Sequence, residues 1–302
     1  MLAVAALPLV ASPFLTALAL TCLLYVALAV SWSLFSGPTR YLSLATSAFY
    51  GLGAYTTAVG LGTLPWPLLV LGGALAAALL ALLIGLLTLR LRGAYFAVLS
   101  FGLGEVVRHT VTYVEKSLSG TVGRVLVDAP EVPALYATMA TIALAAMLAF
   151  HLVQRSDLGV ALRAIGDDEQ RAATLGVDPR RVKTVAFCLS AAFAGAAGAA
   201  MAPRSTYIDP ASVFNPFILF QTVLIAMVGG PTRLHGPVIA ALLFSVLSEA
   251  LRLSLPYLYL IALGLLLILS VLFLPAGLAG IGWLDRWFAP RAPLVKSDGA
   301  QR

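Results

Sequence analysis

The chain has 302 residues, of which 61% are hydrophobic and only 11% are charged, and its mean hydropathy is +0.97. Soluble domains carry charged residues at about 25%, so this composition excludes a water-soluble globular fold and indicates a membrane protein. The formal net charge of +6 is best explained as the positive excess that orients such a protein in the bilayer, and no nucleic-acid partner is expected.

Long segments without charge begin at the first residue. Residues 1–39 and 41–89 contain no Asp, Glu, Lys or Arg, and each is long enough for one or two crossings at about 20 residues per helix. We therefore predict an all-α, polytopic membrane helical bundle with about nine crossings, in a range of about eight to ten. The predicted crossings are 14–35, 41–60, 64–89, 93–108, 132–154, 183–202, 214–230, 236–254 and 257–275.

Two of these crossings, 41–60 and 93–108, are short or rich in glycine. A broken or re-entrant helix is the alternative at both places, because irregular backbone is tolerated at membrane depth when protein surrounds it.

One polar segment, residues 155–183, interrupts the apolar runs and holds eleven of the chain's 32 charged residues. It contains signals for short helices. Asp167 is the predicted N-cap of one helix, because Gln170 follows at the capping-box spacing, and Gly176 is its predicted C-terminal stop. Asp178 and Pro179 predict the start of the next helix.

These signals favour a compact surface that docks a partner. The simpler alternative is a solvated loop whose charges only set the topology of the chain.

The distribution of Lys and Arg predicts which side of the membrane each loop faces. Cytoplasmic loops hold the positive excess, so we place 155–183 in the cytoplasm and 108–133 outside. The interpretation is one transmembrane domain, 1–285, followed by a flexible cytoplasmic tail, 286–302. The other basic residues that this orientation places inside are Arg90, Arg92, Arg286, Arg291, Lys296 and Arg302.

Several segments resemble, in order along the chain, the permeases of branched-chain amino-acid ABC importers. Residues 158–177, with Arg181 and Lys183, resemble the cytoplasmic loop of that family, and residues 93–108 resemble a block typical of its LivM-type subunit. Residues 37–40 depart from the family, which usually has a less charged, glycine-rich turn there. The other matching segments are 42–56, 228–237 and 275–278.

The resemblance implies a coupling element that fits a groove of an ATPase. Its residues are Arg163, Asp168, Glu169, Ala172, Ala173 and Gly176, with the two alanines permitting close approach and the glycine ending the helix. The implied partners are a second homologous permease, two ATP-binding subunits, a periplasmic or surface-tethered solute-binding protein and the lipid bilayer. The implied location is the inner membrane of a bacterial or archaeal cell.

The chain itself contains no sequence that can bind ATP in a P-loop, which requires glycine directly before the lysine. Its three lysines, Lys116, Lys183 and Lys296, follow Glu115, Val182 and Val295. We therefore expect no enzyme activity, no cofactor and no metal site on this chain, with ATP and Mg²⁺ bound by the partner subunits.

The translocation pathway is harder to predict, and our candidates are aromatic or small residues in the matching segments. They are Ser43, Phe49, Gly51, Tyr95, Phe96 and Ser100. Packing is the alternative role for all of them. Two Glu-x-x-Arg pairs, Glu105 with Arg108 and Glu249 with Arg252, are expected to neutralise themselves locally, a reading favoured over direct substrate contact.

Leucine, isoleucine and valine are the substrates that the resemblance favours, while other amino acids, amides and urea remain open. The alternative class is an ion-coupled secondary transporter or a channel for a small solute. A membrane-embedded enzyme would need a convergent nucleophile or metal set, which the sequence lacks.

Overall fold

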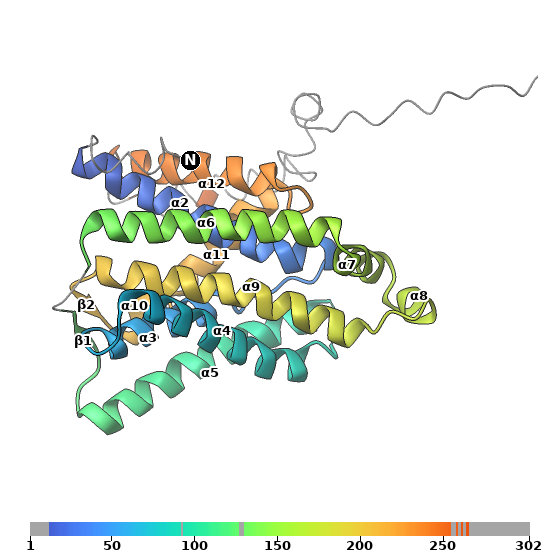
Figure 1. Cartoon of the computed structure of the whole chain (residues 1–302), viewed down its shortest axis with the longest axis horizontal. Helices are drawn as coiled ribbons and strands as arrows, with labels where there is room; N and C mark the ends of the chain where they lie inside the picture. The colour runs from blue at the N-terminus through green and yellow to red at the C-terminus, as the bar shows by residue number, and fades with distance from the viewer. Residues whose placement is uncertain are drawn as a thin grey trace, which may run out of the picture.

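The computed structural model describes residues 12–91, 93–126 and 130–254, together with Leu258, Ile261, Gly264 and Leu265. Long helices that run along a common direction form the body of the molecule (Figure 1). They are α2 (Pro13–Thr39), α3 (Thr46–Gly60), α4 (Trp66–Thr88), α5 (Ala94–Ser119), α6 (Val132–Arg155), α9 (Pro179–Met201), α11 (Pro216–Gly229) and α12 (His235–Ser254). The shorter elements are α7 (Asp157–Asp167), α8 (Glu169–Thr174), η1 (Ala202–Arg204), α10 (Pro210–Val213), β1 (Arg124–Val125) and β2 (Tyr207–Ile208).

The structure confirms an all-α polytopic bundle but not the predicted count of nine crossings. In the described ranges, six helical segments are long and apolar enough to span a membrane: α2, α4, α6, α9 with η1, α10 with α11, and α12. Helix α3 has 15 residues and is about 22 Å long, which is shorter than a hydrocarbon core of about 30 Å. Helix α5 is long enough but charged. The predicted crossing 257–275 lies almost entirely outside the described residues.

Small residues bring the central helices together. Helix α9 packs against α3 and α4, and a Cβ added at Gly53 of α3 or at Gly73 of α4 would come too close to Gly195 or Ala199 of α9. Lipid gives no hydrophobic advantage to helix contact, so close backbone approach through small residues is what stabilises such pairs. Helices α3, α4 and α9 therefore form one tightly packed unit.

The predicted crossing 41–60 is helical only from Thr46 onward, where α3 runs unbroken to Gly60. The alternative of a helix broken within this segment is therefore not confirmed. Residues 40–45 form a non-helical linker, a break between α2 and α3. Two side chains satisfy the buried backbone of this linker: Trp32 donates its indole N–H to the carbonyl oxygen of Ser43 at 2.9 Å, and Ser100 accepts from the amide of Leu44 at 3.0 Å. Unpaired backbone groups are costly inside a membrane, so these contacts are what permit the break. At 93–108 the alternative is wrong, since α5 is continuous.

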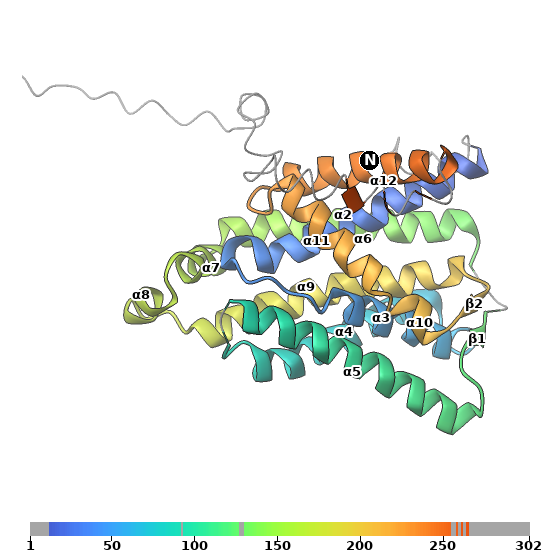
Figure 2. The same cartoon turned by 180° about the vertical axis from the view of Figure 1, so that it is seen from behind.

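The two ends of the bundle differ. Helices α7 and α8 lie at one end, which we call the coupling end, and α8 lies farthest from the body (Figures 1 and 2). At the other end, which we call the sheet end, β1 pairs antiparallel with β2, with Arg124 opposite Ile208 and Val125 opposite Tyr207. Because β1 follows α5 and β2 follows η1, this ladder ties together two loops that are distant in sequence.

Candidate coupling site

Helix α8 begins at an acidic cap, one residue later than the sequence predicts. Asp168, and not Asp167, is the N-cap: its Oδ1 accepts hydrogen bonds from the backbone amides of Gln170 at 2.9 Å and Arg171 at 3.1 Å. The cap satisfies two of the four amides that a helix start leaves unpaired. The predicted N-cap was wrong because Asp167 and Asp168 are adjacent aspartates with the same capping chemistry. Asp167 forms an ion pair with the distant residue Arg40 instead.

The predicted stop of this helix is confirmed. Gly176 has φ +89°, a conformation that glycine adopts at little cost. Its amide donates to the carbonyl oxygen of Ala173, and the amide of Val177 donates to that of Ala172, which together form a Schellman motif. Asp178 then caps α9 as predicted, through the amides of Arg180 and Arg181.

Helix α7 is fastened to the ends of α2 and α6. Arg163 donates to the side-chain oxygen of Gln154 at 2.8 Å and to its carbonyl oxygen at 3.1 Å. A Cβ at Gly166 would collide with the carbonyl oxygen of Pro38, so α7 touches the backbone of α2. The exposed pair of Asp167 and Arg40, at 2.8 Å, spans the same contact. Arg40 itself has φ 59° and ends α2, which shows how the turn that departs from the family pattern closes.

Glu169, the first residue of α8, belongs to a buried cluster of polar groups. Its Oε1 lies 2.8 Å from Nζ of Lys183 in α9, and its Oε2 accepts a hydrogen bond from the hydroxyl of Tyr41 at 2.7 Å. Lys183 also donates to the carbonyl oxygen of Leu89 at 2.9 Å and to the Tyr41 hydroxyl at 3.2 Å. Each hydrogen of the ammonium group thus has an acceptor.

This cluster is well shielded from water. The side chain of Lys183 is 1% exposed and that of Glu169 is 15% exposed. The ammonium nitrogen also lies 4.5 Å from the centre of the Tyr41 ring, within the range of a cation–π contact. Glu169 is in α8, Lys183 in α9, Tyr41 in the linker before α3 and Leu89 at the end of α4. The ion pair and its hydrogen bonds therefore hold four segments of the bundle together. We call Glu169, Lys183 and Tyr41 the charge cluster.

The sequence predicts a role for Glu169 but none for Lys183 or Tyr41. The sequence did contain a signal for Lys183, because it is a charged residue near the start of an apolar membrane helix. Such residues face the protein interior and pair with another group. Nothing local in the sequence marks Tyr41, whose contacts are all formed across the fold.

An aromatic layer continues from the charge cluster into the membrane. The ring of Tyr41 lies 5.4 Å from that of Phe96, and Phe187 lies 5.0 Å from Phe35 and 5.3 Å from Phe49, between ring centres. Rings at such distances pack in stable tilted or edge-to-face pairs. Two of the predicted pathway residues, Phe49 and Phe96, are therefore brought together in this layer.

The other predicted pathway residues have different surroundings. Ser43 is buried within the linker before α3 and Ser100 is buried beside it, Gly51 is packed against the ring of Phe214, and Tyr95 is 78% exposed on α5. The two Glu-x-x-Arg pairs form as expected, at 2.6 Å for Glu105 with Arg108 and 3.1 Å for Glu249 with Arg252.

The outer surface of α8 contains an apolar residue that the sequence analysis missed. Of the two alanines expected to permit close approach, Ala172 is buried against the bundle and Ala173 is exposed. Leu175, directly after them, is 81% exposed at the tip of the coupling end. The sequence did contain a signal for this exposed position, because the leucine lies between the predicted helix and its glycine stop. Ala173 and Leu175 give α8 a small apolar contact surface.

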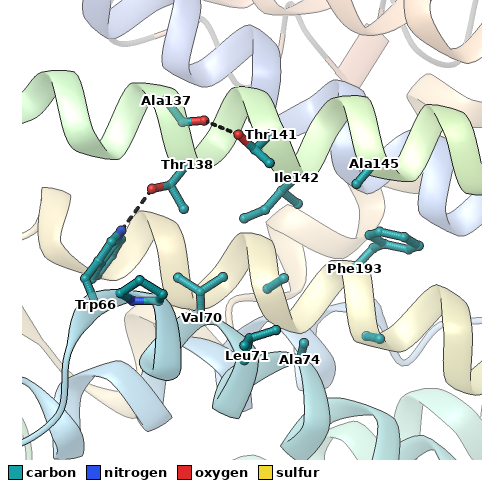
Figure 3. Close-up of a pocket in the computed structure, with 13 residues that line it drawn as sticks. Trp66, Val70, Leu71, Ala74, Ala137, Thr138, Thr141, Ile142, Ala145 and Phe193 are labelled. Carbon is teal, nitrogen blue, oxygen red and sulfur yellow. Dashed lines mark hydrogen bonds between the residues drawn. The ribbon is translucent and has the colours of Figure 1, made fainter.

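A cavity of about 490 Å³ lies between α4, α6 and α9 (Figure 3). Trp66 donates its indole N–H to the Thr138 hydroxyl at 2.9 Å at one end, and Val70, Ile142 and Phe193 lie among the apolar side chains that form the rest. Among the residues that the structure describes, no charged residue lines it. This lining is suited to a hydrocarbon group. A zwitterionic amino acid would lose its hydration there and find no charged group to pair with.

Taken together, helices long and apolar enough to cross a membrane and a capped polar element fastened to them by a buried ion pair define a multi-pass membrane protein. The family model described as "Branched-chain amino acid transport system / permease component" matches residues 14–271. The chain therefore belongs to this family of permeases.

Individual relatives agree with this assignment. The chain is 29% identical over 292 residues to the high-affinity branched-chain amino acid transport system permease protein LivM of Escherichia coli, covering 85% of this chain and 68% of that protein. The LivM protein of Salmonella typhimurium is similar to the same extent. The LivH protein of Salmonella typhimurium is 33% identical over 143 residues, which cover 45% of this chain and 44% of that protein. No solved structure matches the chain.

Proposed function

We propose that the chain is the LivM-type permease subunit of an ABC importer that carries leucine, isoleucine or valine across the inner membrane of a bacterial or archaeal cell. The observation that carries the proposal is the family match over residues 14–271, joined to relatives whose names specify branched-chain amino acid transport. The charge cluster and the exposed tip of α8 support a role in coupling, because they combine a docking surface with a rigid attachment to the membrane helices.

The energy for transport comes from partners in this proposal. Two ATP-binding subunits bind ATP and Mg²⁺ and dock on the coupling end, a second homologous permease completes the pathway, and a solute-binding protein delivers the amino acid at the sheet end. The chain itself needs no cofactor and catalyses no reaction.

The charge cluster is the proposed path by which movement of the ATPases enters the membrane. A force on Ala173 and Leu175 acts on α8, whose first residue, Glu169, is bound to α9 through Lys183 and to the linker before α3 through Tyr41. A buried ion pair resists separation because each charge would be left without a partner in a medium of low dielectric constant. Movement of α8 is therefore passed to α9 and to this linker together.

The proposal is tested by reconstitution into liposomes. The complete complex, with binding protein outside and ATP at the ATPases, is expected to accumulate labelled leucine above its external concentration, and the chain alone is expected to accumulate none. Uphill uptake by the chain alone, driven by a proton or sodium gradient, would instead establish the ion-coupled alternative.

The orientation has its own test. A protease or a labelling reagent applied outside intact cells is expected to leave residues 155–183 untouched. Cleavage there would contradict the proposed coupling role.

A further inference from the structure

A second cavity, of about 420 Å³, lies towards the sheet end and is lined by polar as well as apolar side chains. Its walls come from α2, α11 and α12, with further residues from α3, the end of α9 and η1. Two of its charged residues, Glu249 and Arg252, are in the last turns of α12, and the third, Arg204, ends η1 directly after α9. We call it the polar cavity. Its size falls within the range of about 300–1,000 Å³ typical of sites for small molecules.

The charged groups of the polar cavity have unused bonding capacity. Arg204 donates to the Thr21 hydroxyl at 3.1 Å, and no carboxylate forms an ion pair with it among the described residues. Glu249 accepts a hydrogen bond from Arg252 through Oε1 at 3.1 Å. Its Oε2 has no hydrogen-bond partner among the residues that the structure describes. A guanidinium and a carboxylate oxygen are thus both available to a bound molecule.

A buried amide adds a further donor. Gln221 is 4% exposed, and its side-chain oxygen accepts a hydrogen bond from the hydroxyl of Tyr25 at 2.7 Å. That bond orients the amide, whose nitrogen makes no hydrogen bond with the described residues. Leu24, Phe217 and Ile218 supply apolar surface in the same cavity.

We infer that the polar cavity is a transient binding site for an aliphatic amino acid in its zwitterionic form. Arg204 and the amide of Gln221 bind the carboxylate, Oε2 of Glu249 accepts from the ammonium group, and the apolar wall takes the side chain. This inference rests on the proposed function and adds the place and the chemistry of recognition. The apolar cavity between α4, α6 and α9 does not meet the same need, because the described residues that line it include no charged group.

The balance of charge predicts an order of preference among ligands. Two arginines and one glutamate leave the cavity with one excess positive charge, so the carboxylate matters more than the ammonium group. Leucine is expected to bind best, followed by 4-methylpentanoate, which lacks the ammonium group. 3-Methylbutylamine, which lacks the carboxylate, is expected to bind least.

Binding is measured in the complete complex by protection of a cysteine. Ser248→Cys, in the background Cys22→Ala and Cys188→Ala, places a thiol in the cavity lining, and leucine is expected to slow its reaction with a membrane-impermeant maleimide about threefold or more when most sites are filled. Leu118→Cys, at the exposed end of α5, is the control and is expected to react equally with and without leucine. Equal protection by all three ligands, or by none, would overturn the inference.

Transport gives the second readout. Loss of a hydrogen bond to a charged group is expected to lower leucine uptake about tenfold in Glu249→Gln and in Arg204→Gln, with the complex still assembled. Glu105→Gln, which alters the other Glu-x-x-Arg pair outside the cavity, is the matched control and is expected to keep most of the uptake. If the wild-type complex accumulates leucine and both cavity variants transport it as well as the wild type, the binding site is refuted. A wild-type complex that accumulates no amino acid would refute the proposed function instead.

Discussion

Replacing Lys183 by methionine is expected to release α8 from the bundle and to uncouple ATP hydrolysis from uptake. The substitution keeps most of the side-chain volume but removes the positive charge, so the carboxylate of Glu169 remains largely buried without its cation. Breaking one side of a buried ion pair costs about 3–5 kcal/mol. Glu169 keeps its bond to Tyr41 and some contact with water, so we take the lower end, about 3 kcal/mol, which is roughly a 150-fold change in the equilibrium between docked and released α8.

Hydrogen exchange in the reconstituted complex, followed by mass spectrometry of the peptide that contains α8, measures this release directly. The protection of its amides is expected to fall by roughly two orders of magnitude in Lys183→Met, and leucine uptake per ATP hydrolysed is expected to fall with it. The double variant Glu169→Gln, Lys183→Met removes both charges and is expected to regain part of the protection.

The control for this experiment is the exposed pair of Arg171 and Asp168, which lie 3.1 Å apart on the same helix. Arg171→Met is expected to change the protection of α8 less than about fivefold, because exposed ion pairs contribute about 0–1 kcal/mol. Unchanged exchange and unchanged coupling in Lys183→Met would refute the assigned role of the charge cluster. A double variant as poorly protected as the single one would show that the unpaired charge is not the cause.

Three further substitutions test other parts of the fold. Gly176→Val forces a β-branched residue to φ +89° and is expected to cost about 1–3 kcal/mol at the end of α8, seen as faster amide exchange there; unchanged exchange would contradict this account of the helix stop. Gly53→Ala is expected to lower the melting temperature in detergent because its Cβ collides with the backbone of Gly195, whereas Gly72→Ala, with open space around it, is expected to leave it equal or raise it; equal losses would contradict the packing argument. Leu175→Asp is expected to abolish stimulation of the ATPases without changing the melting temperature, and full stimulation would exclude the tip of α8 from docking.

Features that depend on neighbours in the sequence were predictable. The stop at Gly176 and the start at Asp178 and Pro179 follow from bonds between residues a few positions apart, and the structure has both. The cap of α8 was displaced by one residue because Asp167 and Asp168 offer the same chemistry. Only the contact of Asp167 with Arg40, 127 residues away, decides between them, and no local pattern contains it.

Features that depend on tertiary contacts were predicted only as residue types. Ser43 and Ser100 stand out in the sequence as small polar residues in apolar segments. In the structure Ser43 belongs to the linker and accepts through its backbone carbonyl, while the hydroxyl of Ser100 accepts from the amide of Leu44. The glycines of the segment 41–60 did not predict the linker, because they lie inside the continuous helix α3. The pairing of Lys183 with Glu169 needed the fold, since α8 must turn back towards α9 before the two side chains meet.

Helix α9 connects the charge cluster with the polar cavity. Lys183 lies near its first turn, and Arg204 follows its last residue through η1, so the two charged groups are about 30 Å apart along a helix that rises about 1.5 Å per residue. Gly198 places the backbone of α9 directly against that of α3, and Gly195 places it against that of α4. Such close contacts transmit a displacement because packed interiors deform little. A shift of α8 that moves Lys183 therefore moves Arg204 relative to Glu249 on α12. The guanidinium and the carboxylate proposed to bind the two ends of an amino acid then separate or approach, which is the change in affinity that a transport cycle requires.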